Sequence, residues 1–331
     1  MHRIETEFAG RTLVIETGKM AKQAAGACLV RFGDTMVLAA VTVSKTVSTL
    51  PFFPLTVEYR EKTYAAGKIP GGFLKREGRP SDKEILAARG IDRSIRPLFP
   101  EGFKNEIQVF VTVISADQEN DADVLGVLAA STALAISPIP WDGPIAAVRV
   151  GQVEGNWILN PTFQQLEFST IDLFVTGSAD SIVMVEGGAL EISEKEVLDA
   201  LKIGQKGIKE LIGVAQKVIT KAAKPTMAWV KAERDAALTK RVEELAEKAM
   251  AKAINAKDKA GRSEGVAKVK ASVVEQLLTE FPDQGRTIGN ENVEGEYRVM
   301  RAQALATGAR VDGLGKVHPG ADDNASGVAV L

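Results

Sequence analysis

The chain has 331 residues, of which 45% are hydrophobic and 25% are charged, and its formal net charge is −2. This composition is typical of a globular protein with room for two domains. The balanced charge excludes a globally basic surface, so a nucleic-acid site has to be a local patch. The one cysteine, Cys28, excludes a disulfide within the chain, and we expect it to be a buried structural thiol. Because no signal or transit pattern and no apolar run of roughly 18 residues is seen, we expect a cytoplasmic protein without a membrane partner.

The N-terminal half predicts an α+β domain with mostly antiparallel strands, ending near residue 186. The pair Gly33–Asp34 lies between two β-branched runs and indicates a tight hairpin. Runs of this kind, bounded by glycine and other turn residues, predict strands at 12–18, 27–34, 35–44, 54–59, 107–115, 145–151, 157–161, 171–177 and 181–187.

Two helices are predicted within this domain, at 81–95 and 121–137. Ser81 and Glu84 form a capping box at the start of the first helix, and Pro97 disfavours helical backbone beyond its end. The second helix has a small-residue apolar surface, which is typical of a buried helix.

After residue 188 the composition shifts towards Ala, Glu and Lys, which favours helices. A long amphipathic helix is expected at 193–220, opened by a capping box of Ser193 and Glu196. Further helices are predicted at 232–257, 264–281 and 293–306. We therefore expect a small all-α domain joined through the region of Pro225.

The glycine-rich segment GGFLKREGRP, at 71–80, is a candidate binding loop. Phe73 follows two glycines and has little local core to enter, so it is available to stack on a nucleic-acid base, a contact worth roughly 1–3 kcal/mol. Lys75, Arg76 and Arg79 are placed to follow a sugar–phosphate backbone beside it. A plain glycine turn is the alternative. A phosphate loop is excluded because the motif GxxxxGK[ST] is absent.

Three arginines lie on one face of the helix that follows, because Arg89, Arg93 and Arg96 are spaced i, i+4 and i+7. Ile91 and Ile95 point the other way and are expected to anchor the helix. Guanidinium groups so close together need anions between them, and phosphate suits their forked geometry. The alternative is that nearby carboxylates neutralise them within the fold, namely those of Glu84, Asp92 and Glu101.

These segments resemble the bacterial polynucleotide phosphorylase family. The run KIPGGFLKREGRPSDKEILAARGIDRSIRPLFPEGF, at 68–103, is similar to the first core of that family. ETGKMAKQAAGACLVRFGDTMVLAAVTVS and SPIPWDGPIAAVRVG extend the resemblance, which covers about residues 5–313. It implies an α+β, RNase PH-like core of the ribosomal protein S5 domain 2-like type, followed by a small all-α domain. The expected divisions are an N-terminal part of the first core at 1–145, its C-terminal part with the long helix at 146–224, an all-α RNA-binding domain at 225–310, and a tail at 311–331.

The resemblance also implies an activity. Members of the family degrade single-stranded RNA processively from its 3′ end, use phosphate as co-substrate, release nucleoside diphosphates and need a divalent metal such as Mg²⁺. They form a homotrimeric ring and work with RNA-degradation partners such as an endonuclease or a helicase. The family loop pinches RNA with two aromatic residues followed by two arginines. The matching positions here are Phe73, Leu74, Lys75 and Arg76, which implies a weaker clamp of the same kind.

No catalytic residue is expected in this chain. The family's catalytic groups lie in a second core, on a serine-rich turn and on an Asp-Met-Asp-Phe-Lys strand. The matching segments here, 120–126 and 170–177, lack those serines and carry Phe174 in place of the lysine. Asp172 is then a lone acid and only a weak metal candidate. Asp117, Asp121 and Asp123 also invite a metal-site interpretation, but helix capping explains Asp121 and Asp123 more simply.

The end of the chain departs from the family. TGARVDG, at 307–313, matches the usual opening of a second core, but LGKVHPGADDNASGVAVL, at 314–331, does not. That segment resembles the zinc-site region of M28-type aminopeptidases, with Asp322 or Asp323 as bridging ligand, but the upstream His-x-Asp pair reads Arg310-Val311-Asp312, so one ligand is lacking. We expect a truncated or foreign, disordered tail and an inactive chain that binds and guides RNA. The alternatives are a non-catalytic RNA-binding or ring-assembly module and, remotely, a metallopeptidase fragment.

Overall fold

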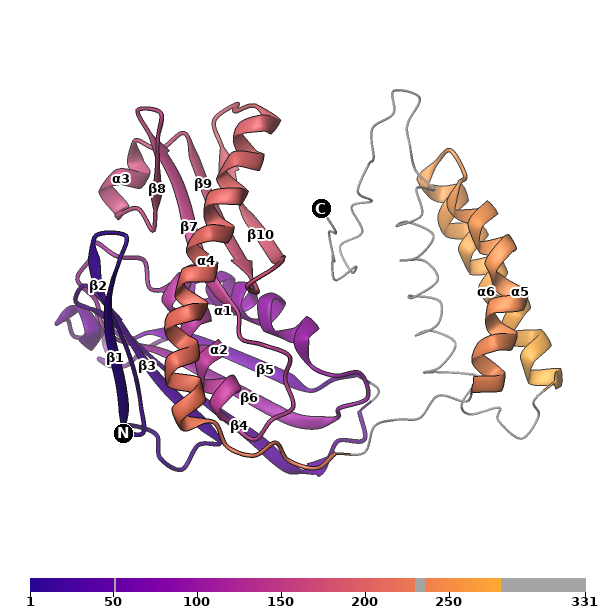
Figure 1. Cartoon of the computed structure of the whole chain (residues 1–331), viewed down its shortest axis with the longest axis horizontal. Helices are drawn as coiled ribbons and strands as arrows, with labels where there is room; N and C mark the ends of the chain where they lie inside the picture. The colour runs from indigo at the N-terminus through magenta and orange to yellow at the C-terminus, as the bar shows by residue number, and fades with distance from the viewer. Residues whose placement is uncertain (51, 230–235, 281–331) are drawn as a thin grey trace. The chain divides into compact units, whose positions relative to one another are not determined.

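The computed structural model describes residues 1–50, 52–229 and 236–280, and these form two compact units (Figure 1). Unit 1 comprises the described residues up to 229, and unit 2 comprises residues 236–280. The helix predicted at 293–306 and the tail at 311–331 lie outside the described residues.

Unit 1 contains a six-stranded sheet in the order β1-β2-β3-β4-β6-β5. All neighbouring strands are antiparallel except β5 and β6, which are parallel and therefore need a long crossover. The crossover carries the 3₁₀ turn η1 (Thr63–Ala66), helix α1 (Asp82–Ile95) and the turn η2 (Arg96–Leu98). The strands are β1 (His2–Phe8), β2 (Arg11–Thr17), β3 (Gly26–Phe32), β4 (Thr35–Val47), β5 (Leu55–Glu61) and β6 (Asn105–Ser115).

The hairpin predicted at Gly33–Asp34 is confirmed, because Phe32 pairs with Thr35 across a two-residue turn. Gly33 has φ +59, in the left-handed region. A Cβ atom there would lie 2.9 Å from the side-chain nitrogen of Asn120, so a larger residue would be strained and would have to displace that side chain.

A second sheet of unit 1 has the order β10-β9-β7-β8, with all neighbours antiparallel. Its strands are β7 (Ala146–Val153), β8 (Asn156–Leu159), β9 (Ile171–Gly177) and β10 (Ile182–Ala189). The short helix α3 (Phe163–Glu167) precedes β9. Helix α3 was not predicted from the sequence, although Thr162 and Gln165 form a capping box that marks its start.

Two helices join the sheets into one core. Helix α2 (Asp123–Ile136) is buried along nearly its whole length and contacts β3, β4 and β7. Helix α4 (Glu194–Ala222) has 29 residues and contacts β7 and β9 in one sheet and β1 and β2 in the other, and it runs along both in Figure 1. The buried Cys28 lies in this core, as predicted. The structure is therefore the mixed α+β core that the sequence predicted.

Unit 2 is a helical hairpin of α5 (Ala236–Ile254) and α6 (Lys259–Glu280). Its core consists of Leu238, Val242, Ala246, Met250, Ile254, Val273 and Leu277. Helix α6 begins before the predicted residue 264, because the carboxylate of Asp258 accepts a hydrogen bond from the N–H of Gly261 at 2.6 Å. Within the described ranges, no helix is both long and apolar enough to cross a membrane.

Candidate nucleic-acid interface

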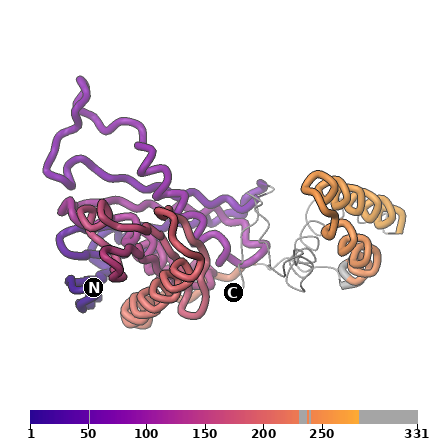
Figure 2. The backbone as a smooth tube through the Cα atoms, turned by 90° about the horizontal axis from the view of Figure 1, so that it is seen from above, coloured from indigo at the N-terminus to yellow at the C-terminus, as the bar shows by residue number. Residues whose placement is uncertain are grey.

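The glycine-rich loop between η1 and α1 is fixed at its base. Arg60 donates a hydrogen bond to the carbonyl of Gly78 at 3.0 Å. The backbone N–H and the hydroxyl of Thr63 donate to Glu77 Oε1 at 3.0 and 2.8 Å, and these bonds lower the pKa of the Glu77 carboxyl. Figure 2 shows the loop as the purple segment that extends away from the rest of unit 1. Its base is therefore held while residues 71–76 project.

The tip of the loop presents apolar side chains to solvent. The N–H of Lys75 donates to the carbonyl of Gly72 at 3.0 Å, and Lys75 itself has φ +50, so the chain turns tightly there. Phe73 is 99% exposed and Leu74 is 75% exposed. Phe73 is thus exposed, as the sequence predicts. An aromatic ring with no protein neighbour is available for a ligand with a flat face.

Helix α1 follows the loop and is anchored at its first turn. The predicted capping box is confirmed: Ser81 Oγ accepts from the N–H of Glu84 at 3.3 Å, and Glu84 Oε2 accepts from the N–H of Ser81 at 2.7 Å. Glu84 Oε1 also accepts from the N–H of Glu61 in β5 at 2.9 Å. Ile91 and Ile95 are fully buried, as predicted. These contacts fix which face of α1 meets solvent.

Of the three arginines predicted on one face of α1, Arg93 and Arg96 are paired with carboxylates of the protein. Arg96, at the C-cap of α1, donates to both oxygens of Asp92 at 2.9 and 2.7 Å and to the carbonyls of Phe53 and Leu55. Arg93 donates to Glu186 of β10 at 3.0 Å. The carboxylate alternative is therefore right for Arg96, although Glu186 and not one of the three acids named from the sequence neutralises Arg93.

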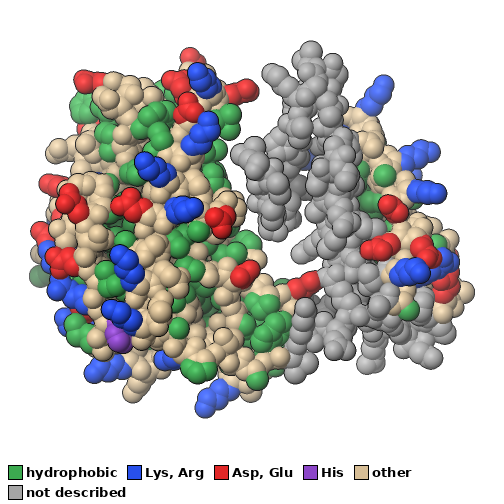
Figure 3. Space-filling model, in the orientation of Figure 1, with side chains coloured by type: hydrophobic (Ala, Val, Ile, Leu, Met, Phe, Trp, Pro, Cys, Tyr) green, Lys and Arg blue, Asp and Glu red, His purple; other side chains and the backbone are tan. Residues whose placement is uncertain are grey.

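Four of the predicted cations remain unpaired. Within the described residues, no ion pair or side-chain hydrogen bond involves Lys75, Arg76, Arg79 or Arg89, all of which are exposed. Elsewhere on the face of unit 1 drawn in Figure 3, positive and negative side chains are interspersed. The combination of an exposed ring with uncompensated positive charge suits a flexible polyanion with aromatic bases, which is single-stranded nucleic acid.

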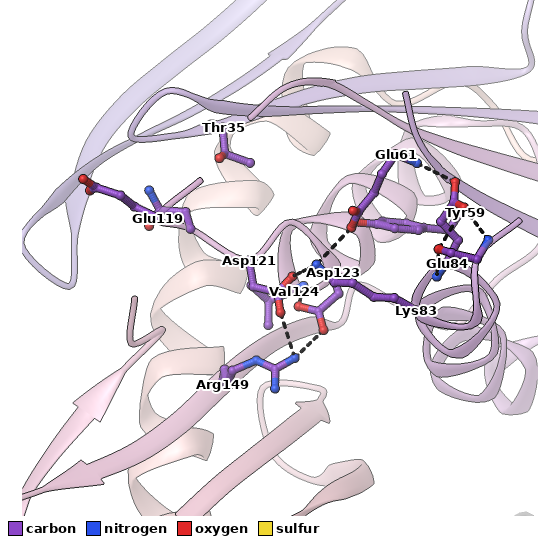
Figure 4. A network of polar contacts seen from close by, with 12 residues as sticks. Thr35, Tyr59, Glu61, Lys83, Glu84, Glu119, Asp121, Asp123, Val124 and Arg149 are labelled. Carbon is purple, nitrogen blue, oxygen red and sulfur yellow. Dashed lines mark hydrogen bonds and ion pairs between the residues drawn. The ribbon is translucent and has the colours of Figure 1, made fainter. Parts of the chain in front are cut away.

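The segments expected to match a catalytic centre meet around Arg149 of β7, which Figure 4 shows beside Asp121 and Asp123. Its side chain is only 14% exposed. Nη1 donates to the two oxygens of Asp172 at 2.7 and 2.9 Å, and Nη2 lies 3.2 Å from Asp121 Oδ2 and also donates to Asp123. Lys83 adds a second cation, 3.3 Å from Asp121 Oδ1. The three carboxylates are thus held by protein cations.

The pKa of Asp123 is raised to about 6, first by burial and then by the charge of Asp121, against the opposing effect of Arg149. Burial alone would lower the pKa of Arg149, but the three carboxylates raise it overall. The cluster is therefore an internal ion network with excess negative charge.

This arrangement corrects the capping interpretation of Asp121 and Asp123. The N-cap of α2 is Ala122, whose side chain makes no capping bond, and only Asp123 accepts a hydrogen bond from a first-turn N–H, that of Val124. Both acids pair with Arg149, a role that was not predicted from the sequence. The signal was present, since an arginine interrupts the apolar run 145–151. In the part of the chain that the structure describes, no three acidic, histidine or cysteine side chains are placed to hold a metal ion.

Asp117, the third acid of the proposed metal cluster, fixes a turn. Its carboxylate accepts from Thr35 Oγ1 and from the backbone N–H groups of Glu119 and Asn120, each at 2.9 Å. Burial alone would raise the pKa of Asp117, but these hydrogen bonds lower it to about 2. Asp117 therefore joins the β3–β4 hairpin to the segment before α2.

Comparison with known families accounts for most of the chain. Residues 9–140 match the model described as "3′ exoribonuclease family, domain 1", and residues 143–207 match "3′ exoribonuclease family, domain 2". Residues 237–314 match "Polyribonucleotide nucleotidyltransferase, RNA binding domain".

Curated relatives agree with these matches. The chain is 64% identical to the polyribonucleotide nucleotidyltransferase of Gemmatimonas aurantiaca over 96% of its own length and 43% of that protein. It is 45% identical to that of Geobacter sulfurreducens over 94% of the chain and 45% of the relative, and 45% identical to that of Thermus thermophilus over 95% and 45%. The chain thus spans less than half the length of these relatives. It belongs to the 3′ exoribonuclease family, with the domain order of a polyribonucleotide nucleotidyltransferase.

Proposed function

We propose that this chain binds and guides single-stranded RNA within a polyribonucleotide nucleotidyltransferase, an enzyme that shortens RNA processively from its 3′ end with phosphate and releases nucleoside diphosphates. The observation that carries the proposal is the loop tip: Phe73 is 99% exposed between glycines and unpaired cations. The names of the relatives and of the matched RNA-binding domain support the choice of RNA.

The loop grips RNA by stacking and by charge. Phe73 stacks on a base of any identity, and Lys75, Arg76, Arg79 and Arg89 attract phosphates, so the contact does not depend on sequence. Leu74 offers no π-face, and Lys75 is a point charge and not a forked donor. Arg93 and Arg96 are the weakest members of the proposed site, because their charges are already compensated.

In this proposal, the chain by itself has no phosphorolytic centre. Mg²⁺ needs several uncommitted oxygen ligands, and the residues around Asp172 do not fit it, because Arg149 already holds both of its oxygens. Phosphorolysis by the whole enzyme, with Mg²⁺ and phosphate, therefore draws its catalytic groups from outside the residues described for this chain.

Further parts of the proposal follow the family. We propose a cytoplasmic homotrimer that works with RNA-degradation partners such as an endonuclease or a helicase. We also propose domain boundaries at residues 145 and 224, supported by the change from the first sheet and α2 to β7 at Ala146, and by the end of α4 at Ala222.

Fluorescence anisotropy with a labelled oligoadenylate tests the loop assignment. The double variant Phe73→Ala/Arg76→Ala removes the ring and one cation. We expect its affinity for the oligoadenylate to fall at least about tenfold from the loss of stacking alone, and its salt dependence to become shallower. The matched control is Phe168→Ala/Lys195→Ala, which removes an exposed ring and an exposed cation elsewhere on unit 1. Equal affinity of the loop variant, the control and the unmodified chain at low salt would show that the loop does not bind RNA.

ADP release from poly(A) in the presence of phosphate and Mg²⁺ tests the proposal that this chain alone has no phosphorolytic centre. We expect no turnover by the chain alone. Robust release, abolished by removal of phosphate, would contradict the assignment of catalysis to groups outside the described residues.

A further inference from the structure

A single acidic residue, Glu77, lies in the otherwise basic segment from Lys62 to Ser81. In a loop that attracts a polyanion, the charge of a carboxylate opposes binding. Within the described residues Glu77 forms no ion pair with its neighbours Lys75 and Arg76. The presence of this acid in the loop therefore needs a reason other than charge. The basic residues of the segment are Lys62, Lys68, Lys75, Arg76 and Arg79.

Glu77 closes the loop where its two ends meet. Its Oε1 accepts from the backbone N–H and the hydroxyl of Thr63 at 3.0 and 2.8 Å. One residue further on, the carbonyl of Gly78 accepts from Arg60 of β5 at 3.0 Å. The Nε atom of Arg60 lies 3.8 Å from the carboxylate of Glu84, a buried residue. We call Arg60, Thr63, Glu77 and Gly78 the loop neck, and it ties the C-terminal arm of the loop to the first sheet.

Beyond the neck, the loop has little to orient it. Residues 71–80 are all exposed, and a Cβ atom added at Gly71 or Gly72 would meet no other part of the protein within 4 Å. Among the described residues, the tip contains one backbone hydrogen bond, from Lys75 to Gly72. Figure 2 shows the loop standing away from the rest of unit 1. The direction in which Phe73 is presented is therefore set at the neck and not by packing.

We infer that Glu77 is a positioning residue for RNA binding, which holds the loop neck closed through Thr63 and so keeps Phe73 and Arg76 in one arrangement before RNA arrives. This inference rests on the proposed function of the loop. A loop that is already ordered binds more tightly, because less conformational entropy is lost when the ligand binds. If the neck opens, the binding-competent fraction falls, and the apparent affinity falls by the same factor.

The charge of Glu77 and its hydrogen bonds predict opposite effects on affinity, so two substitutions separate them. Glu77→Ala removes the charge and the acceptor, whereas Glu77→Gln removes the same charge but keeps an oxygen that accepts from Thr63. If charge alone mattered, both variants would bind RNA more tightly. We expect Glu77→Ala to bind labelled oligoadenylate about threefold to tenfold more weakly, the equivalent of one net hydrogen bond. Glu77→Gln should lie closer to the unmodified chain.

Fluorescence anisotropy across a range of salt concentrations measures these affinities. The control is Asp82→Ala, which removes an exposed acid from the first turn of α1 and should not weaken binding. The slope of log affinity against log salt should keep its magnitude in Glu77→Ala, because no cation is lost, whereas Arg76→Ala should lower it by about 0.7. Unchanged or tighter binding by Glu77→Ala, or a weaker binding that Glu77→Gln shares in full, would overturn the inference.

Thr63→Val tests the neck from its other side. Valine removes the hydroxyl donor but keeps the backbone N–H, so we expect part of the loss seen for Glu77→Ala. Combined with Glu77→Ala it should add little, because both changes remove the same contact. The midpoint of urea unfolding of unit 1, followed by tryptophan fluorescence, should stay the same, since the neck lies outside the core. Fully additive losses, or affinities that fall only in step with that midpoint, would contradict a positioning role.

Hydrogen exchange of the Thr63 amide in the absence of RNA provides a second measurement. We expect faster exchange in Glu77→Ala than in the unmodified chain, and equal rates would overturn the closed neck. The proposed function fails separately: no RNA binding by the unmodified chain at low salt would overturn it, and the inference with it. RNA binding that is weakened by Phe73→Ala/Arg76→Ala but not by Glu77→Ala would overturn the positioning role alone.

Discussion

Replacement of Arg149 by methionine tests whether the acid cluster is an internal ion network. Methionine retains an apolar stem but removes the charge that faces Asp121, Asp123 and Asp172. The side chains of Arg149 and Asp123 are 14% exposed and that of Asp121 is 9% exposed, so little water can replace the lost cation beside those two acids, whereas Asp172 is 44% exposed and stays solvated. Removal of one partner from a buried ion network costs about 3–5 kcal/mol. For a domain of this size we therefore expect the Tm of unit 1 to fall by about 6–20 °C.

The loss should depend on pH in a defined direction. The pKa of Asp123 is already raised to about 6 from its usual 3.8, so its protonated form is favoured by folding. Its contribution to stability is fully present below pH 3.8 and is lost as the pH rises through 6. Without Arg149 the pKa rises further, so we expect Arg149→Met to lose more stability at pH 8 than at pH 5.

Tryptophan fluorescence during urea unfolding provides the assay. All three tryptophans, Trp141, Trp157 and Trp229, lie in unit 1, so the signal reports that unit. The control is Arg31→Met, because Arg31 is an exposed arginine paired with Asp34 and should cost less than about 1 kcal/mol. A loss of less than 1 kcal/mol for Arg149→Met, or an equal loss at pH 5 and pH 8, would refute the reasoning.

Two further substitutions test local hydrogen bonds within unit 1, with the same unfolding assay. Ser81→Ala removes the cap of α1 and should cost about 1 kcal/mol, whereas Ser81→Thr keeps the hydroxyl and should cost clearly less; equal losses would argue against capping. Asp117→Asn should cost about 1–2 kcal/mol at pH 7 after allowance for solvent screening. Because the pKa of Asp117 is lowered to about 2, its contribution is present above pH 3.8 and is lost as the pH falls towards 2. The difference between variant and unmodified chain should therefore shrink between pH 7 and pH 3, and a constant difference would contradict the assignment.

Local patterns predicted much of the fold because the deciding contacts are local. The Gly33–Asp34 turn and the capping boxes at Ser81 and Ser193 each join residues within three positions, and all are present. Strand β1 was missed because arginine and glutamate alternate with few apolar residues in it, and its place depends on pairing with β2 and on contact with α4.

In the candidate site too, features set by neighbouring residues were predictable and features set by distant residues were not. The exposure of Phe73 was predictable, because glycines on its N-terminal side leave the ring no local packing partner. The pairing of Arg93 was not predictable, because Glu186 is 93 residues away and reaches α1 only through the arrangement of β10. The cluster at Arg149 likewise joins β7, β9 and the start of α2, which no periodicity in the sequence brings together.

Photocrosslinking tests the central claim, that the loop tip grips RNA, most directly. A single-stranded RNA carrying 5-iodouridine is irradiated on the full chain, and the crosslinked residues are identified by mass spectrometry. A base stacked on an aromatic ring crosslinks efficiently, so we predict a major crosslink at Phe73 that disappears in Phe73→Ala. Crosslinks confined to other elements, while the chain still binds the RNA, would contradict the claim.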